Sequence, residues 1–321
     1  MSPIKLLFLL PLLAALGATP QQGITPEKKK ELAELRRELR QTAVLLAKRN
    51  WAEADQVLGD LEIRFVRWAD SCGLTKRDPG LSTDLKTLTD WQTTVDSNLK
   101  VGAPPADLGL DPFYQKHIDF RGLAIVSSGK VPDAALVKAR AIIREMVSKR
   151  PDVIAELVKQ KVRVAIMAKT ELTTDIPEHA TLTPKDYWDK RARGLGASVE
   201  RPVASGAEEN LLGYPDDRYK GENIFLHEFS HTIHTMGLPG LDPGFDAAVQ
   251  AAYEAAKKKG LWERTYAIEN HREYFAEGVQ SWFDANLESI PPNGIHNHVN
   301  TRKELEAYDP GLAALIRKVF P

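Results

Sequence analysis

The chain has 321 residues, of which 43% are hydrophobic and 27% are charged, proportions that are ordinary for a soluble globular protein. Its 43 Lys and Arg residues nearly balance its 44 Asp and Glu residues, so charge gives no reason to expect a nucleic-acid partner or an anionic membrane surface. The single cysteine, Cys72, excludes an internal disulfide. This length allows one large domain or two modest ones.

Residues 1–18 are typical of a secretory signal peptide. A positive start at Lys5 precedes an apolar run over residues 6–16, and the small residues that follow suit a signal peptidase. The run is too short to span a bilayer, although an uncleaved N-terminal anchor is the alternative interpretation. We therefore expect a secreted or periplasmic protein whose mature chain has no membrane span.

Residues 24–100 are predicted to form a helical hairpin or small bundle. Thr25 as N-cap and Pro26 in the first turn mark a helix start, and apolar residues then recur at helical spacing. Helices are expected over residues 27–49, 51–71 and 84–99. No residue pattern in this region indicates chemistry, so its expected role is to pack against the main domain or project from it.

A proline-containing linker over residues 101–106 separates this region from a second one, in which strand and helix patterns alternate. Strands are expected over residues 120–127 and 161–168, with one or two more around 199–212. Helices are expected over residues 132–146, 152–160, 221–236, 243–258, 267–287, 302–308 and 311–319. A few strands followed by helices predict an α+β domain over residues 112–321.

The strongest motif is His-Glu-x-x-His at residues 227–231. His227 and His231 lie one turn apart on the same face of a predicted helix, where two imidazoles can hold one Zn²⁺ at about 2.0–2.1 Å each. Glu228 can reach a water on the same metal and act as general base. The alternative is a pair of hydrogen-bonded core histidines, which would leave a buried Glu228 without a partner.

A catalytic zinc site needs a third protein ligand. A third histidine in His-x-x-Gly-x-x-His is excluded, since His234 stands at the Gly position and Gly237 at the last His position. An aspartate in Gly-Thr-x-x-Asp is absent as well, which leaves a glutamate on a downstream helix.

Three glutamates of that helix, Glu269, Glu273 and Glu277, are spaced four residues apart and would share one face. If Glu273 is the ligand, Glu277 lies one turn further on and can hydrogen-bond a ligand imidazole. Glu269 is the alternative ligand, and a solvated face of three carboxylates is the alternative to any metal site.

The pairing of this motif with Tyr266 and the run from Glu273 to Glu277 resembles the gluzincin zinc metallopeptidases of the anthrax-lethal-factor-like group, which includes the Pro-Pro endopeptidases. The resemblance spans roughly residues 112–290, and Tyr266 precedes Glu273 by the seven residues found in that group. It implies a zincin-like fold, a single catalytic Zn²⁺, Glu273 as third ligand and Tyr266 as a transition-state stabiliser.

The sequence thus predicts a secreted zinc endopeptidase that acts on a peptide or protein substrate with Glu228 as general base. His234 shares the stripe of His227 and His231, so it is either a substrate contact or a packed histidine. The alternatives are a catalytically silent zinc-binding or scaffold protein of the same fold and a zinc hydrolase of a non-peptide amide. Glu228 and Tyr266 favour an enzyme, because a binding protein needs neither.

Overall fold

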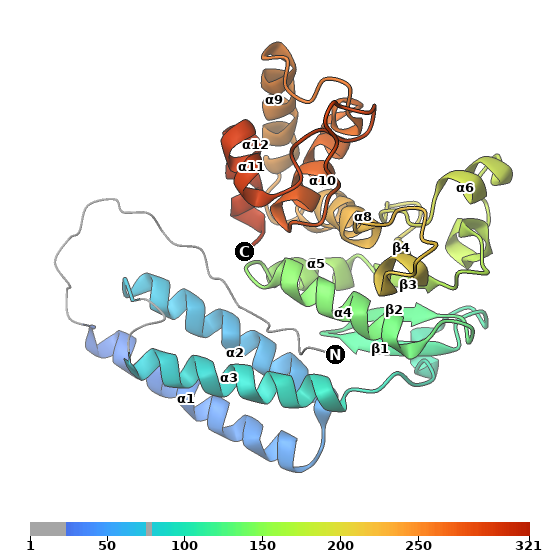
Figure 1. Ribbon diagram of the computed structural model, residues 1–321. Helices are drawn as coiled ribbons and strands as arrows, with labels where there is room; N and C mark the ends of the chain where they lie inside the picture. Colours follow the sequence, from blue (N-terminus) through green and yellow to red (C-terminus); the bar gives the residue numbers. More distant parts are fainter. Residues whose placement is uncertain (1–23, 75–78) are drawn as a thin grey trace. The chain divides into compact units, whose positions relative to one another are not determined.

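The computed structural model describes residues 24–74 and 79–321, which form two compact units, one ending at Leu99 and one running from Lys100 to Phe320 (Figure 1). The predicted signal peptide lies outside the described residues. Among the helices that are described, none is both long and apolar enough to cross a membrane.

The first unit consists of three helices, α1 (Pro26–Ala47), α2 (Trp51–Ser71) and α3 (Pro79–Asn98), as the sequence predicts. Thr25 caps α1 by accepting a 3.2 Å hydrogen bond from the Lys28 amide. The helices enclose a core that includes Leu58, Phe65 and Val95. The third helix begins five residues earlier than expected, since a proline is well tolerated in a first turn.

The second unit contains a mixed sheet of four strands in the order β1-β2-β3-β4. The strands are β1 (Lys116–Phe120), β2 (Leu123–Ser127), β3 (Arg163–Met167) and β4 (Val203–Ala207). The first two pair antiparallel, and the other neighbours pair parallel.

One strand prediction needs correction. The single strand expected over residues 120–127 is the second half of a hairpin, whose turn places Arg121 and Gly122 at positive φ, as tight two-residue hairpins require. Of the one or two strands expected over residues 199–212, one is present as β4, and a short helix, α7 (Glu208–Leu212), follows it. The predicted strand over residues 161–168 is confirmed as β3.

Helices make up most of the rest of this unit, which confirms the α+β class. They are α4 (Asp133–Val147), α5 (Asp152–Lys159), α6 (Lys185–Arg191), α8 (Ile224–Thr232), α9 (Phe245–Lys258), α10 (His271–Trp282), α11 (Arg302–Tyr308) and α12 (Pro310–Val319). A π-helical turn (Ile233–Gly237) extends α8, and a 3₁₀ turn (Tyr266–Ile268) precedes α10.

Helices and loops cover the sheet, and only its edge strand β1 is largely half-buried. Helix α4 packs against β1 and β2, and α8 packs against β4 (Figure 1). The core on one face of the sheet gathers Ala124, Val126, Ala165, Met167 and Val203 with Tyr114 and Ile176 from the loops. Residues of β2 and β4 are therefore buried throughout, as is expected of parallel strands covered on both faces.

Close contact with β4 sets the position of α8. Phe225 and Phe229 are buried on the sheet side of this helix, and burial of each ring contributes on the order of 2 kcal/mol. Gly206 of β4 faces Phe225, where an added Cβ would lie 2.8 Å from its ring. The strand and the helix can approach this closely because residue 206 has no side chain.

Helix α10, which carries Glu273 and Glu277, packs against α8, which carries the His-Glu-x-x-His motif. The amide of Asn223, at the start of α8, donates to the carbonyl of Ala285 beyond the end of α10 with a length of 3.0 Å. Helix α10 begins at His271, four residues later than expected, because the Asn270 side chain caps it. Glu269 therefore precedes the helix and does not share a helical face with Glu273, which corrects the prediction.

Candidate metal centre

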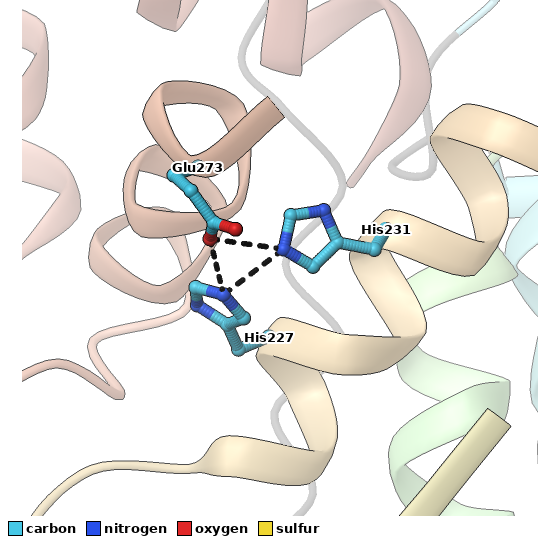
Figure 2. A group of neighbouring side chains, drawn as sticks. All are labelled: His227, His231 and Glu273. Carbon is cyan, nitrogen blue, oxygen red and sulfur yellow. Dashed lines mark hydrogen bonds and ion pairs between the residues drawn. The ribbon is translucent and has the colours of Figure 1, made fainter. Parts of the chain in front are cut away.

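Three side chains meet between α8 and α10 (Figure 2). His227 and His231 project from α8, and Glu273 projects from the first turn of α10 toward both rings. The Nε2 atoms of the two histidines are 3.1 Å apart, and each lies 3.1 Å from Oε2 of Glu273. The predicted pair of histidines and the glutamate expected from the family resemblance are thus neighbours.

This triangle of donor atoms fits a small divalent cation. In a tetrahedral site with bonds of about 2.0–2.1 Å, neighbouring ligand atoms are separated by about 3.3 Å, close to the three distances observed here. Two imidazole nitrogens and one carboxylate oxygen are also a donor set found in catalytic zinc sites, which leave a fourth position open. The residues present therefore fit Zn²⁺.

The electrostatics of the centre favour positive charge. Burial alone would lower the pKa of His227, but the carboxylates of Glu273, Glu228 and Glu277 raise it to about 10. Burial alone would raise the pKa of Glu273, but its contacts with His227 and His231 hold it well below its usual range. At neutral pH His227 is therefore protonated beside an ionised Glu273, and a bound divalent cation would displace that proton.

Caps at the two helix starts place the ligands. Asn223 accepts a 2.9 Å hydrogen bond from the Leu226 amide at the start of α8. Asn270 accepts from the amides of Arg272 and Glu273 at 2.9 and 3.0 Å. Since Glu273 is itself bonded to the cap, the beginning of α10 and the position of its carboxylate are determined together.

Gln280 orients the ring of His227, a role that the sequence analysis missed. Its Oε1 atom lies 2.7 Å from Nδ1 of His227, so the imidazole donates there and keeps the Nε2 lone pair for a metal. Gln280 is two helical turns after Glu273, on the same face of α10, which is the signal that could have identified it. It is fully buried.

Glu277, the residue predicted for that role, is also buried but lies further away. Its Oε1 atom is 3.6 Å from Nδ1 of His227, which is within ion-pair range but too long for a hydrogen bond. Its other oxygen accepts a 3.0 Å hydrogen bond from Asn286. Burial raises the pKa of Glu277, which lies behind His227, whereas Gln280 provides the oriented acceptor.

Glu228 is half-buried on α8 beside the ligands. It directly follows His227 in the chain, and its negative charge contributes to the raised pKa values of both His227 and Tyr266. An added Cβ at Gly194 would lie 3.0 Å from Cγ of Glu228, so the chain passes directly over this residue.

The segment that passes over α8 is extended. Leu195 pairs antiparallel with Ser205 of β4, and the Ser205 amide donates to the Leu195 carbonyl at 2.8 Å. An added Cβ at Gly196 would lie 2.7 Å from Cβ of His231. These glycines therefore allow the close approach of this segment to the ligand helix.

Tyr266 stands next to the ligands at the 3₁₀ turn before α10. Its ring centroid is 6.4 Å from that of His227, and its hydroxyl accepts a 2.8 Å hydrogen bond from Nη2 of Arg191. Burial, together with the nearby Glu273 carboxylate, raises the pKa of Tyr266 to about 12, so the phenol stays protonated at neutral pH. Nothing in the sequence indicated that Arg191, which lies 75 residues away, would contact Tyr266.

Two other candidates lie outside the group. Glu269 is exposed and is not among the clustered donors of the described residues. His234 lies in the π-helical turn and is 1% exposed, with its ring centroid 4.8 Å from that of Phe275. Its Nε2 atom is 3.1 Å from Oδ1 of Asp246. Burial leaves His234 no surface for direct substrate contact, so its place is that of a packed histidine.

No protein-family model matches this chain, and neither the curated proteins nor the solved structures include one that is significantly similar to it.

Proposed function

We propose that this chain is a secreted zinc-dependent endopeptidase of the gluzincin type, with a zincin-like catalytic domain in its second unit. The observation that carries the proposal is the 3.1 Å triangle of His227, His231 and Glu273 donor atoms. The resemblance of the motifs to the lethal-factor-like peptidases supports the same conclusion. The predicted signal peptide supports secretion or a periplasmic location.

His227, His231 and Glu273 would hold the ion, and Gln280 would keep His227 in the metal-binding tautomer. Bound there, Zn²⁺ would polarise a carbonyl and bring the pKa of a water toward about 7. Glu228 would accept a proton from the attacking water and deliver it to the leaving amine. The Tyr266 hydroxyl would donate to the carbonyl oxygen as negative charge develops on it.

A silent zinc-binding scaffold would need the three ligands only. Glu228 is half-buried next to them, and a protonated Tyr266 stands at the same centre. Both groups suit amide hydrolysis, because one can accept a proton and the other can donate a hydrogen bond. An enzyme is therefore preferred to a scaffold, and the family resemblance of the motifs favours a peptide as the source of the leaving amine.

The proposal is tested with the purified mature chain, by measuring bound zinc and the digestion of a peptide library. We expect one zinc per chain and cleavage that a chelator abolishes and added zinc restores. Glu228→Gln should retain the zinc and lose at least about 100-fold in rate, since it removes the general base. Glu269→Gln, which alters an exposed carboxylate outside the group, is the matched control and should behave as the wild type.

Two results would contradict the proposal. Zinc binding without chelator-sensitive cleavage of any library peptide would favour the scaffold, or hydrolysis of a non-peptide amide if simple amides are cleaved instead. Unchanged activity in Glu228→Gln would exclude that residue as the general base.

A further inference from the structure

Arg191 connects the end of α6 to the tyrosine at the metal centre. Its Nη2 atom donates to the Tyr266 hydroxyl at 2.8 Å, and its own carbonyl accepts a 2.6 Å hydrogen bond from the hydroxyl of Tyr219. Three separate segments are joined in this way: the end of α6, the loop before α8 and the 3₁₀ turn before α10. Tyr219 fixes the backbone from which the Arg191 side chain extends.

The backbone of Tyr266 is also fixed. Its amide donates to the carbonyl of Ile295 at 2.8 Å, so the turn that carries the ring is anchored from behind. What remains free is the rotation of the side chain and of the hydroxyl proton. Arg191 is the described residue that hydrogen-bonds this hydroxyl, and it therefore restricts both rotations.

The chemistry of the two groups gives the contact a direction. A phenol has one proton to donate and two lone pairs that accept, whereas a guanidinium can only donate. Arg191 therefore occupies an acceptor position on the Tyr266 oxygen and leaves the proton for another acceptor. A cationic donor also withdraws electron density from the phenol oxygen, which makes the remaining O–H a stronger donor.

We propose that Arg191 is a positioning residue, which holds Tyr266 so that its hydroxyl proton points at the oxygen that gains negative charge during hydrolysis. This inference rests on the proposed function and extends it to a residue outside the motif. Arg191 acts through Tyr266 and not through the metal ligands. The planar fork of arginine matters here, because a lysine ammonium in the same place would carry the charge without the fixed direction.

The test is a double-mutant cycle with Arg191→Met and Tyr266→Phe, measured as kcat and KM separately. Arg191→Met should lower kcat about 10- to 100-fold and leave KM within about 3-fold, since it weakens a transition-state donor without removing it. In the Tyr266→Phe background the same change should cost less than about 2-fold, because the hydroxyl on which it acts is gone. Arg191→Lys should lie between the wild type and Arg191→Met.

Lys190→Met is the matched control, since it removes an exposed positive charge from the adjacent position of α6. It should retain the wild-type kcat. Losses that multiply in the double variant, or equal losses in Lys190→Met and Arg191→Met, would overturn the inference.

Two readouts do not depend on turnover. A peptide with a tetrahedral phosphinate should bind Arg191→Met at least about 10-fold more weakly than the wild type in calorimetry, while a thiol peptide should bind both equally. In the metal-free protein, the ¹³Cζ NMR signal of Tyr266, assigned by its loss in Tyr266→Phe, should shift in Arg191→Met and not in Lys190→Met.

These readouts separate the two proposals. An inactive wild type would contradict the proposed function, and the NMR comparison would still decide whether Arg191 positions Tyr266. An active wild type with unchanged phosphinate binding and an unchanged Tyr266 signal in Arg191→Met would overturn the inference alone.

Discussion

Gln280 and Glu277 show how two buried groups one turn apart can differ in what they do for the same imidazole. Gln280 hydrogen-bonds Nδ1 of His227 at 2.7 Å, whereas Glu277 stays at 3.6 Å and is bonded to Asn286. A neutral amide oxygen in the closer position fixes the tautomer and adds no charge where a carboxylate is already buried. The direction of the ring thus depends on Gln280.

Replacing Gln280 with leucine should weaken zinc binding by about 10- to 100-fold, because the ligand ring loses the acceptor that orients it. The measurement is competition with a chelator of known affinity. Gln280→Glu retains an acceptor and should lose less than Gln280→Leu. Equal affinity of Gln280→Leu and the wild type would show that packing alone holds the ring.

At the scale of elements, the site depends on how closely the segment around Gly194 and Gly196 lies on α8. The Ala197 amide donates to the Thr232 hydroxyl at 2.9 Å, so this segment is bonded to the end of the ligand helix as well as to β4. A side chain at Gly196 would have to displace either the segment or the helix. Helix α8 and the segment therefore act as one packed element.

Gly196→Ala should destabilise the protein by about 1–3 kcal/mol, since the new Cβ would lie 2.7 Å from Cβ of His231 and 3.1 Å from the Glu228 carbonyl. Zinc affinity should fall as well, because His231 is the residue that must shift. Urea unfolding and chelator competition measure the two effects. Gly244→Ala is the control, with its nearest atom at 3.8 Å, and a loss of similar size there would contradict the steric argument.

At the scale of the whole molecule, His179, a buried histidine outside the candidate metal centre, links stability to pH. Nε2 of His179 lies 3.0 Å from the hydroxyl of Ser205 in β4. Burial, with a smaller contribution from the Arg201 cation, lowers the pKa of His179 to about 4. The folded protein therefore keeps this ring neutral at pH values where the unfolded chain protonates it.

The unfolded chain binds this proton near pH 6.5 and the folded protein only near pH 4, so stability falls as the pH falls through that window. Between pH 7 and pH 5, His179 should account for about 2 kcal/mol of lost unfolding free energy. Urea unfolding of metal-free wild type and His179→Gln at both pH values isolates this contribution. Parallel losses in the two proteins would show that His179 is not its source.

Most helices of the structure could be predicted from the sequence, because apolar spacing and capping residues are local signals. The three N-terminal helices and β3 are examples. The first strand, β1, was missed because it is short and its polar and apolar residues alternate. Only a two-residue turn separates it from the apolar run of β2. The start of α10 was misplaced because the cap at Asn270 competes with a helical pattern that continues before it.

The helical period by itself determined that His227 and His231 share a face, since residues four apart in a helix are neighbours whatever surrounds them. It could not determine which glutamate joins them, because that depends on the packing of α10 against α8. The same holds for Gln280 and Arg191, which lie 53 and 75 residues from the side chains that they contact. Such contacts arise only when the chain folds, and tertiary structure alone decided them.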